Sequence, residues 1–238
     1  MPLPYQVVVA RYQEDIDWAE SLPAIIYNKG PLIDTGLEQR PLPNVGREAH
    51  TYLHHILHHW HDLADLTLFA QGNTAAHLPS GVNVSHFFKP SADIVVPWLV
   101  RLREWLPDGR LWFGDEWRWR EKLTTGVIQP AKLTMTEWFR QLVGVDVTTM
   151  DALAYTPGAI FAVRRDLVHR RPRAYYESII RTLMHHTSPE EAYFCEQAWM
   201  YIFGHHDVRI QLLSVPANPN AIAPPDLVPA NFDVGSSR

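Results

Sequence analysis

The sequence predicts a single α/β domain of the Rossmann-like kind, with a mostly parallel central sheet flanked by helices. Short apolar runs rich in β-branched residues alternate with segments of helical periodicity, as in sheets that are buried on both faces. The 238 residues are 46% hydrophobic, which is enough to build one such core. We expect residues 1–213 to form this domain and residues 214–238 to form a proline-rich tail.

The order of the expected elements follows from these patterns. Strands are expected at residues 5–10, 24–27, 66–70, 159–163 and 208–213. Helices are expected at residues 17–19, 47–63, 91–106, 134–144, 172–185 and 189–203. Capping boxes, Thr134 with Glu137 and Ser188 with Glu191, mark two helix starts. Residues 31–43, 71–90 and 107–133 are expected to be loops or irregular structure.

The best-defined element is the helix expected over residues 47–63. Its apolar residues recur with helical spacing, at Ala49, Leu53, Ile56, Leu57, Trp60 and Leu63. Asn44 or Gly46 is placed to cap this helix, and Glu48 complements the positive end of its dipole. Gln71 then ends the next strand, at the carboxyl edge where open α/β sheets bind ligands.

Composition excludes several classes of protein. The net charge of −5 argues against a general polyanion binder, although seventeen of the 21 basic residues are arginine, whose planar fork suits phosphates and carboxylates. The single cysteine, Cys195, permits no internal disulfide. No apolar run reaches the length of a membrane span, and the N-terminus lacks a signal-peptide pattern, so we expect a cytoplasmic protein.

The turn at residues 44–48 is the sharpest candidate site. A helix N-terminus opened by Gly46 offers backbone N–H groups and a partial positive charge to an anion. Arg47 adds a donor fork, and Glu48 adds a carboxylate beside it. The alternative is an ordinary helix cap with a surface ion pair.

Two other patterns suggest metal binding, but each has a simpler interpretation. His50, His54, His58 and His61 share one helix face, which a polar or partly packed surface explains as well as zinc ligation does. Asp15 and Asp17 match the DxD pattern of many sugar transferases, but they follow the first strand, where they also suit a helix cap. We therefore expect no metal and no cofactor.

Two further segments carry candidate functional residues. The basic block Arg164, Arg165, Arg170, Arg171 and Arg173 suits a phosphate backbone, or else forms a solvated surface. Glu196 is a candidate acid or base if its helix borders the cleft, and otherwise an exposed glutamate. Its neighbour Cys195 is expected to pack in the core.

Several segments together resemble one family. They are VVVARYQED at 7–15, IYNKG at 26–30, LPNVGREAHTYL at 42–53, LTLFAQG at 66–72, GAIFAVR at 158–164, RP at 171–172 and EQAWMYIF at 196–203. The sequence resembles a domain of unknown function that is widespread in fungi and some bacteria, is distantly similar to GT-A glycosyltransferases, and includes arginine-containing cyclodipeptide synthases. Asn73 stands where members often carry Asp, and Gln13 stands where Asn is commoner.

The resemblance implies a function and a set of site residues. The function is condensation of arginine and a second amino acid, both taken from aminoacyl-tRNAs, into a diketopiperazine. Such a site needs carboxylates for the guanidinium, a general base, and donors for the oxyanion. The catalytic candidates are Glu48, Glu196 and His50, and the substrate-binding candidates are Asn44, Gly46, Arg47, Tyr52, Arg11, Glu14, Asn28 and Gln71. The basic block at 164–173 would bind the tRNA.

Two other functions stay open on the sequence alone. A GT-A-like glycosyltransferase that uses a nucleotide sugar follows from the distant fold similarity, and the missing Asp at position 73 weakens it. A binding protein without catalytic activity on the same scaffold is the third interpretation.

Overall fold

The computed structural model describes residues 3–89, 91–102, 116–204, 208–214 and 233–234. In this part of the chain the main sheet has eight strands in the order β10-β9-β5-β8-β4-β1-β2-β3. They are β1 (Tyr5–Arg11), β2 (Ala24–Asn28), β3 (Glu38–Pro41), β4 (Leu66–Gln71), β5 (Ile94–Val96), β8 (Phe161–Arg164), β9 (Ile210–Leu212) and β10 (Asp233–Val234). Strands β6 (Val100–Leu102) and β7 (Leu153–Tyr155) form a separate antiparallel pair.

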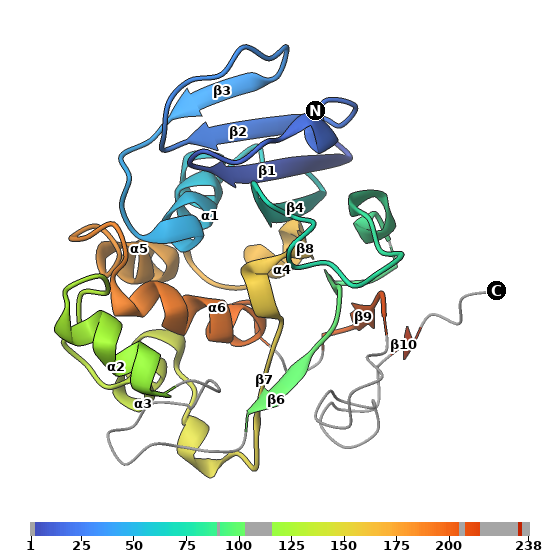
Figure 1. Ribbon diagram of the computed structural model, residues 1–238. Helices are drawn as coiled ribbons and strands as arrows, with labels where there is room; N and C mark the ends of the chain where they lie inside the picture. The colour runs from blue at the N-terminus through green and yellow to red at the C-terminus, as the bar shows by residue number, and fades with distance from the viewer. Residues whose placement is uncertain (1–2, 90, 103–115, 205–207, 215–232, 235–238) are drawn as a thin grey trace.

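Strand β8 is the antiparallel member of the main sheet. It runs against both of its neighbours, β4 and β5, whereas the other neighbouring pairs are parallel. The predicted fold class, a Rossmann-like α/β domain with a mostly parallel sheet and flanking helices, is therefore confirmed (Figure 1).

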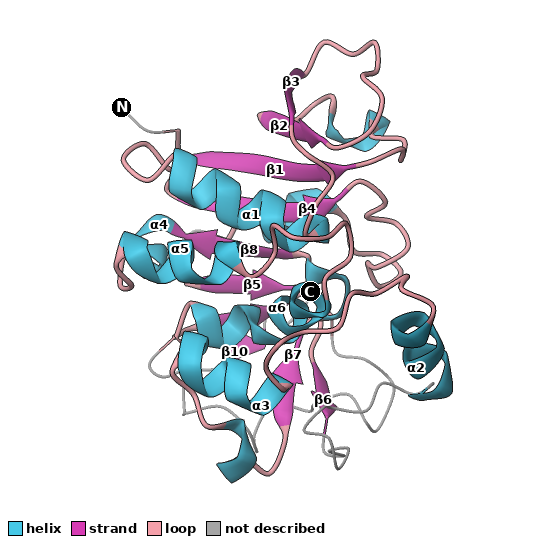
Figure 2. Ribbon diagram, turned by 90° about the vertical axis from the view of Figure 1, so that its left-hand side faces the viewer, coloured by secondary structure: helices cyan, strands magenta, loops and turns pink. Residues whose placement is uncertain are grey.

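Helices and shorter turns surround the sheet. The α-helices are α1 (Arg47–His58), α2 (Glu116–Thr124), α3 (Met135–Trp138), α4 (Arg165–Val168), α5 (Arg173–Arg181) and α6 (Glu190–Ile202). A π-helical turn, η3 (Phe139–Val143), extends α3, and the 3-10 turns are η1 (Asp17–Ala19), η2 (Val84–Phe87), η4 (Val147–Thr149) and η5 (Pro157–Ala159). In Figure 2, α1 and α5 lie in front of the sheet.

Alternation along the strands divides the core between two faces. On β1, Val8 belongs to the cluster under α1, α5 and α6, whereas Val7 and Val9 belong to a second cluster. The second cluster is covered by η1 and η2, through residues such as Ala19 and Phe87. Burial of both faces explains why the central strands are continuous apolar runs.

The helix predicted over residues 91–106 is wrong. Residues 94–96 are β-branched, fully buried and paired between β8 and β9, and Pro97 disfavours a helical conformation at the residue before it. Strand β6 follows, and residues 103–106 lie outside the described part.

Other boundaries also differ from the prediction. The loop expected at 31–43 contains β3, the loop at 71–90 contains η2, and the irregular stretch at 107–133 contains α2. Helix α1 ends at His58 rather than at residue 63. Of the expected tail, residues 215–232 and 235–238 lie outside the described part.

One of the two predicted capping boxes is present. Thr134 and Glu137 exchange both bonds of the box, and Gly144 ends that segment with a φ of +79°. The box at Ser188 is wrong, because α6 begins at Glu190 without a side-chain cap and the Ser188 hydroxyl pairs with the Tyr193 hydroxyl at 3.2 Å. Cys195 is fully buried, which confirms its packing role.

Candidate functional site

A cavity of about 310 Å³ opens at the carboxyl ends of β1, β2 and β4. These strands are parallel neighbours, so the residues that follow them meet at one edge of the sheet. The start of α1 and the segment before α6 complete the wall. The lining residues are Ala10, Arg11, Tyr12, Glu14, Lys29, Asn44, Arg47, Glu48, Gln71, Thr187 and Ser188.

The start of α1 has an unusual backbone. Gly46 has a φ of +61° and Arg47 one of +49°, in the left-handed region. A Cβ at position 46 would lie 2.8 Å from the carbonyl oxygen of Leu183, so both the conformation and the space require glycine. Arg47 and Ala159 are the described residues other than glycine that have positive φ, and such strained positions cluster at functional sites.

The N–H groups at this helix start are distributed differently from the prediction. The Gly46 N–H donates to the carbonyl of His186 at 2.9 Å, and the Arg47 N–H donates to that of Thr187 at 3.3 Å. No side chain caps the helix, so Asn44 does not take the role considered for it. Among the described residues, the N–H groups of Glu48 and Ala49 have no acceptor, but only Glu48 lines the cavity, because Ala49 is fully buried.

Glu48 is a buried carboxylate in the cavity wall. Its residue is 7% exposed, and its Oε2 lies 3.5 Å from the Nε of Arg47. The charge of Glu48 raises the pKa of Arg47. Arg47 also donates a hydrogen bond to the Tyr193 hydroxyl at 3.2 Å and lies over that ring, 4.8 Å from its centroid. These contacts hold a carboxylate and a guanidinium side by side.

Lys29 reaches the same cavity from the end of β2. Its Nζ donates to the carbonyl of Val45 at 2.5 Å and to the carbonyl of Arg47. Burial lowers the pKa of Lys29 to about 7, against the opposing effect of Glu48. A substantial neutral fraction of this amine therefore exists at neutral pH.

Glu196 does not line the cavity, but it lies within the electrostatic influence of Glu48. Its Oε1 accepts a hydrogen bond from the N–H of Gly158 at 2.8 Å. Burial, together with the charge of Glu48, raises the pKa of Glu196 to about 7. The side chain of Gln71, which does line the cavity, donates to the carbonyl of Gly158 at 2.6 Å. The predicted candidates Glu48, Glu196 and Gln71 thus belong to one connected group.

Three other predicted substrate contacts hold the loops of the site. The Arg11 side chain donates to Asn28 Oδ1 at 3.0 Å and to the carbonyl oxygens of Pro31 and Glu14, each at 2.8 Å. Asn28 donates to the Pro31 carbonyl as well, at 2.8 Å. The Glu14 carboxylate accepts the N–H of Tyr12 at 2.7 Å while lining the cavity. Arg11 and Asn28 therefore shape the wall, and Glu14 also faces the ligand space.

His50 and Tyr52 lie on α1 but do not line the cavity. Burial, with Lys29, lowers the pKa of His50 to about 4, so its ring is neutral at pH 7. Burial raises the pKa of Tyr52, and Glu48 and Glu196 act in the same direction. The Tyr52 hydroxyl has no hydrogen-bond partner among the described residues, although it lies within the influence of both carboxylates. Within the described residues, no three His, Cys, Asp or Glu side chains form a group that could hold a metal.

The predicted tRNA-binding arginines lie at the opposite edge of the sheet. Arg164 pairs with Leu66, at the start of β4, whereas the cavity lies at the end of that strand. Three members of the block have carboxylate partners: Arg164 with Asp166, Arg165 with Asp65, and Arg173 with Glu177. Arg171 lies over the ring of Tyr175. The structure does not bring this block to the cavity.

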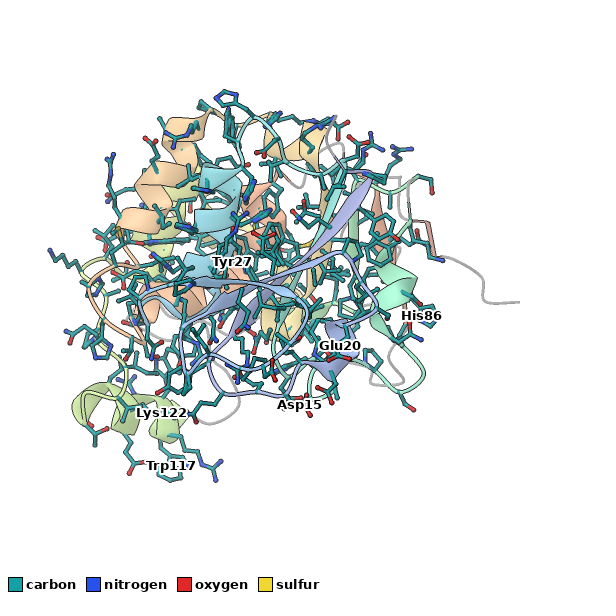
Figure 3. All side chains as sticks on the ribbon, turned by 90° about the horizontal axis from the view of Figure 1, so that it is seen from above. Asp15, Glu20, Tyr27, His86, Trp117 and Lys122 are labelled. Atoms are coloured by element: carbon teal, nitrogen blue, oxygen red, sulfur yellow. The ribbon has the colours of Figure 1, made fainter. Side chains whose placement is uncertain are left out.

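The DxD pattern also lies away from the cavity lining. Asp15 Oδ1 accepts the N–H of Asp17 at 2.9 Å, and both side chains are exposed. Figure 3 shows Asp15 at the edge of the molecule. The pattern therefore serves the turn into η1, the simpler of the two interpretations.

Sequence reasoning missed Lys29, Thr187, Ser188 and Tyr193. A positional rule would have found Lys29, because it directly follows a buried parallel strand, as Gln71 does at the end of another. Thr187 and Ser188 reach the cavity through a segment whose backbone contacts Gly46 and Arg47, which are distant in the sequence. No pattern in the neighbouring sequence indicates such contacts.

The sequence matches the family described as "Protein of unknown function (DUF3431)" over residues 7–88 and 104–214. The chain belongs to the DUF3431 family. The two matched segments contain all the cavity-lining residues and Glu196. No curated protein matches the sequence. Among the described residues of this DUF3431 member, no helix combines the length and the apolar character needed to cross a membrane.

Proposed function

We propose that this protein is an aminoacyltransferase that condenses arginine, delivered as arginyl-tRNA, with a second aminoacyl group and closes the pair into a diketopiperazine. The observation that carries the proposal is the buried carboxylate of Glu48 in the wall of a small cavity. Its charged neighbour, Arg47 Nε, is 3.5 Å away. A substrate guanidinium would supply two parallel, charge-assisted hydrogen bonds to that carboxylate.

The size of the cavity favours an aminoacyl group. A volume of about 310 Å³ is at the lower end of the range of small-molecule sites, roughly 300–1,000 Å³. An arginyl group with its ester suits this space, while the tRNA would remain outside the mouth. A nucleotide sugar needs more room, and Asp15 and Asp17 do not line the cavity. Sugar transfer therefore has no observation of its own in its favour.

The remaining groups suit ester aminolysis. An aminoacyl ester is already activated, so the reaction needs orientation, an acceptor for a proton and stabilisation of an oxyanion. The N–H group of Glu48, which has no acceptor among the described residues, lies at the positive end of α1 in the cavity wall and is a donor for the oxyanion. Glu14 and Glu48 give the cavity two carboxylates for a cationic side chain.

The test is a defined reaction. Purified protein is incubated with arginyl-tRNA and, in turn, with each other aminoacyl-tRNA, and arginine-containing diketopiperazines are measured by mass spectrometry. Parallel reactions contain nucleotide sugars and follow release of the nucleotide. Product from arginyl-tRNA supports the proposal. Nucleotide release without diketopiperazine would replace it with sugar transfer.

A further inference from the structure

Lys29 lines the cavity, and its side-chain amine suits a chemical role in ester aminolysis. Lys29 follows β2 and lines the cavity. It donates two hydrogen bonds to backbone carbonyls, one just before α1 and one in the first residue of α1. The acceptors are the carbonyls of Val45 and Arg47, and the second of these belongs to the strained residue beside Glu48. Lys29 is therefore held in place by the same turn that presents Glu48.

The number of these bonds matters for the protonation state. A neutral amine has two N–H groups and one lone pair, whereas an ammonium group has three donors and no acceptor. The two carbonyls use two donors, so the neutral form is satisfied and keeps its lone pair. The charged form needs a third acceptor in a partly desolvated site. This geometry agrees with the pKa of about 7, which burial causes.

The charged groups around Lys29 shift its pKa in opposite directions. Arg47 lowers its pKa and Glu48 raises it. A guanidinium bound to Glu48 would weaken the effect by which Glu48 raises the pKa of Lys29, and so favour the neutral amine. His50, whose pKa Lys29 helps to lower, is neutral at pH 7 and adds no charge there. Binding of a cationic substrate thus favours the basic form of Lys29.

We propose that Lys29 is the general base of this cavity. This inference rests on the proposed function. The α-amine nitrogen of the second aminoacyl group attacks the carbonyl carbon of the arginyl ester, and a C–N bond forms. The C–O bond to the tRNA ribose breaks. Lys29 Nζ takes one proton from the attacking amine and delivers it to the departing ribose oxygen. A second aminolysis of the same kind, now within the dipeptidyl ester, closes the ring and releases the other tRNA.

Other candidates for the base have competing tasks or other locations. Glu48 is the partner of the substrate guanidinium. Glu196 and His50 do not line the cavity, and the carboxyl of Glu196 accepts a hydrogen bond from Gly158. The Glu14 carboxylate is already occupied as the acceptor of the backbone N–H groups of Tyr12 and Gln13.

The test compares two substitutions of Lys29 with matched controls. Lys29→Met removes the base, and Lys29→Arg keeps hydrogen-bond donors but stays protonated at every accessible pH. Lys132→Met replaces an exposed lysine and controls for the loss of a charge. Turnover should fall about a hundredfold or more in both Lys29 variants, with a much smaller change in KM for arginyl-tRNA, and should stay at the wild-type level in Lys132→Met.

The pH profile identifies the group. Wild-type turnover should rise with pH through an apparent pKa near 7, because the base acts when deprotonated. Glu196 has a pKa in the same range, so Glu196→Gln is needed to separate the two groups. The rising limb should persist in Glu196→Gln and disappear in Lys29→Met and Lys29→Arg. A Lys29→Arg enzyme with wild-type turnover and an intact limb overturns the role.

A second readout does not depend on turnover. Competitive acetylation of the wild-type protein with acetic anhydride across pH, read by peptide mass spectrometry, gives the titration of each lysine. Lys29 should titrate near pH 7, well below 10.5, the ordinary value for a lysine amine. Titration of Lys29 near 10.5 overturns its role as the base. Wild-type protein that forms no diketopiperazine overturns the proposed function and this role together, whereas an active Lys29→Arg enzyme overturns the role alone.

Discussion

Glu196 accepts a hydrogen bond from the backbone N–H of Gly158 at 2.8 Å, and the carbonyl of the same glycine accepts one from Gln71 at 2.6 Å. Two bonds therefore connect α6, the turn before β8 and the carboxyl end of β4. The charge of Glu48 helps to raise the pKa of Glu196. A carboxyl group that lies outside the cavity is in this way coupled to its wall, both mechanically and electrostatically.

Stability should fall as pH rises from about 4.5 to about 7 because of Glu196. Its pKa is about 7 in the folded protein against an ordinary value of 4.5, so the folded state holds the proton more tightly than the unfolded chain does. The difference is worth up to about 3 kcal/mol of unfolding free energy, fully present below pH 4.5. Urea denaturation of wild type and Glu196→Gln across this window measures it. An identical pH dependence in both proteins contradicts the assignment.

Lys29 should have the opposite effect in the next pH window. The folded state binds its proton more weakly than the unfolded chain does, with a pKa of about 7 against 10.5. Unfolding free energy should therefore rise between about pH 7 and 10.5, by a few kcal/mol at most. Lys29→Met should lack this rise, and Lys132→Met should keep it. The same denaturation series, extended to about pH 10, measures the rise in unfolding free energy for the wild type and both variants. A rise that survives in Lys29→Met would exclude Lys29 as its source.

Glu48→Gln should remove activity while leaving the fold intact. Glutamine keeps the shape of the side chain but presents a neutral amide to the substrate guanidinium, whose charge is then unpaired in the cavity. We expect arginyl-tRNA turnover to fall about a hundredfold or more, and arginine selectivity to be lost. Steady-state assays with arginyl-tRNA and thermal melting measure both effects. A folded variant with near-wild-type turnover and selectivity would make Glu14, the other carboxylate that lines the cavity, the leading partner of the guanidinium.

The basic block should contribute little to tRNA binding. Three of its arginines have carboxylate partners, which leaves Arg170 and Arg171 as the members for which a phosphate would compete least. Reversing both to Glu should flatten the slope of log K against log salt by about two units at most. Arg140→Glu, which removes an exposed pair with Asp146, is the control. A much larger loss of slope, measured by filter binding at several salt concentrations, would restore the block as the main interface.

The sequence predicts the central strands well because the apolar, β-branched pattern that favours a buried strand lies within the residues of each strand itself. β-Branched runs such as those of β1 and β4 have only one favourable environment, a sheet that is buried on both faces. The run at 94–96 is equally apolar, but it is short, and its neighbours on either side extend the pattern into one that resembles a helix. Its pairing with β8 and β9, which lie far along the chain, decides its structure.

The site is predictable in outline for a related reason. Glu48, Arg47, Asn44 and Gln71 follow strands or open a helix at the carboxyl edge, a positional rule that a single sequence reveals. The sequence predicts that backbone N–H groups at this helix start face a ligand, but carbonyls of residues 186 and 187 accept those of Gly46 and Arg47. That contact joins segments far apart along the chain, and no local pattern records it.

Gly46, at the start of α1, should be indispensable for two reasons: its left-handed conformation and the lack of space for a Cβ. Gly144 shares only the first of these, so it separates the two effects. Gly46 has a φ of +61°, and an added Cβ would lie 2.7 Å from the Cβ atoms of His50 and Leu183. Gly144 has a similar φ of +79°, but nothing lies within 4 Å of the place that an added Cβ would take. Gly144→Ala should therefore cost about 1–2 kcal/mol, which is the cost of the left-handed conformation alone.

Gly46→Ala should cost more, about 2–5 kcal/mol, because overpacking adds to the same backbone strain. To relieve the clash, the start of α1 must move away from Leu183, and Arg47 and Glu48 move with it. Turnover should therefore fall in Gly46→Ala even where the protein remains folded, while Gly144→Ala keeps its activity. Urea denaturation gives the two free energies, and the diketopiperazine assay gives turnover. Equal destabilisation by the two substitutions would mean that α1 tolerates a side chain at position 46, and the close contact would then not be what fixes Glu48 in the cavity wall.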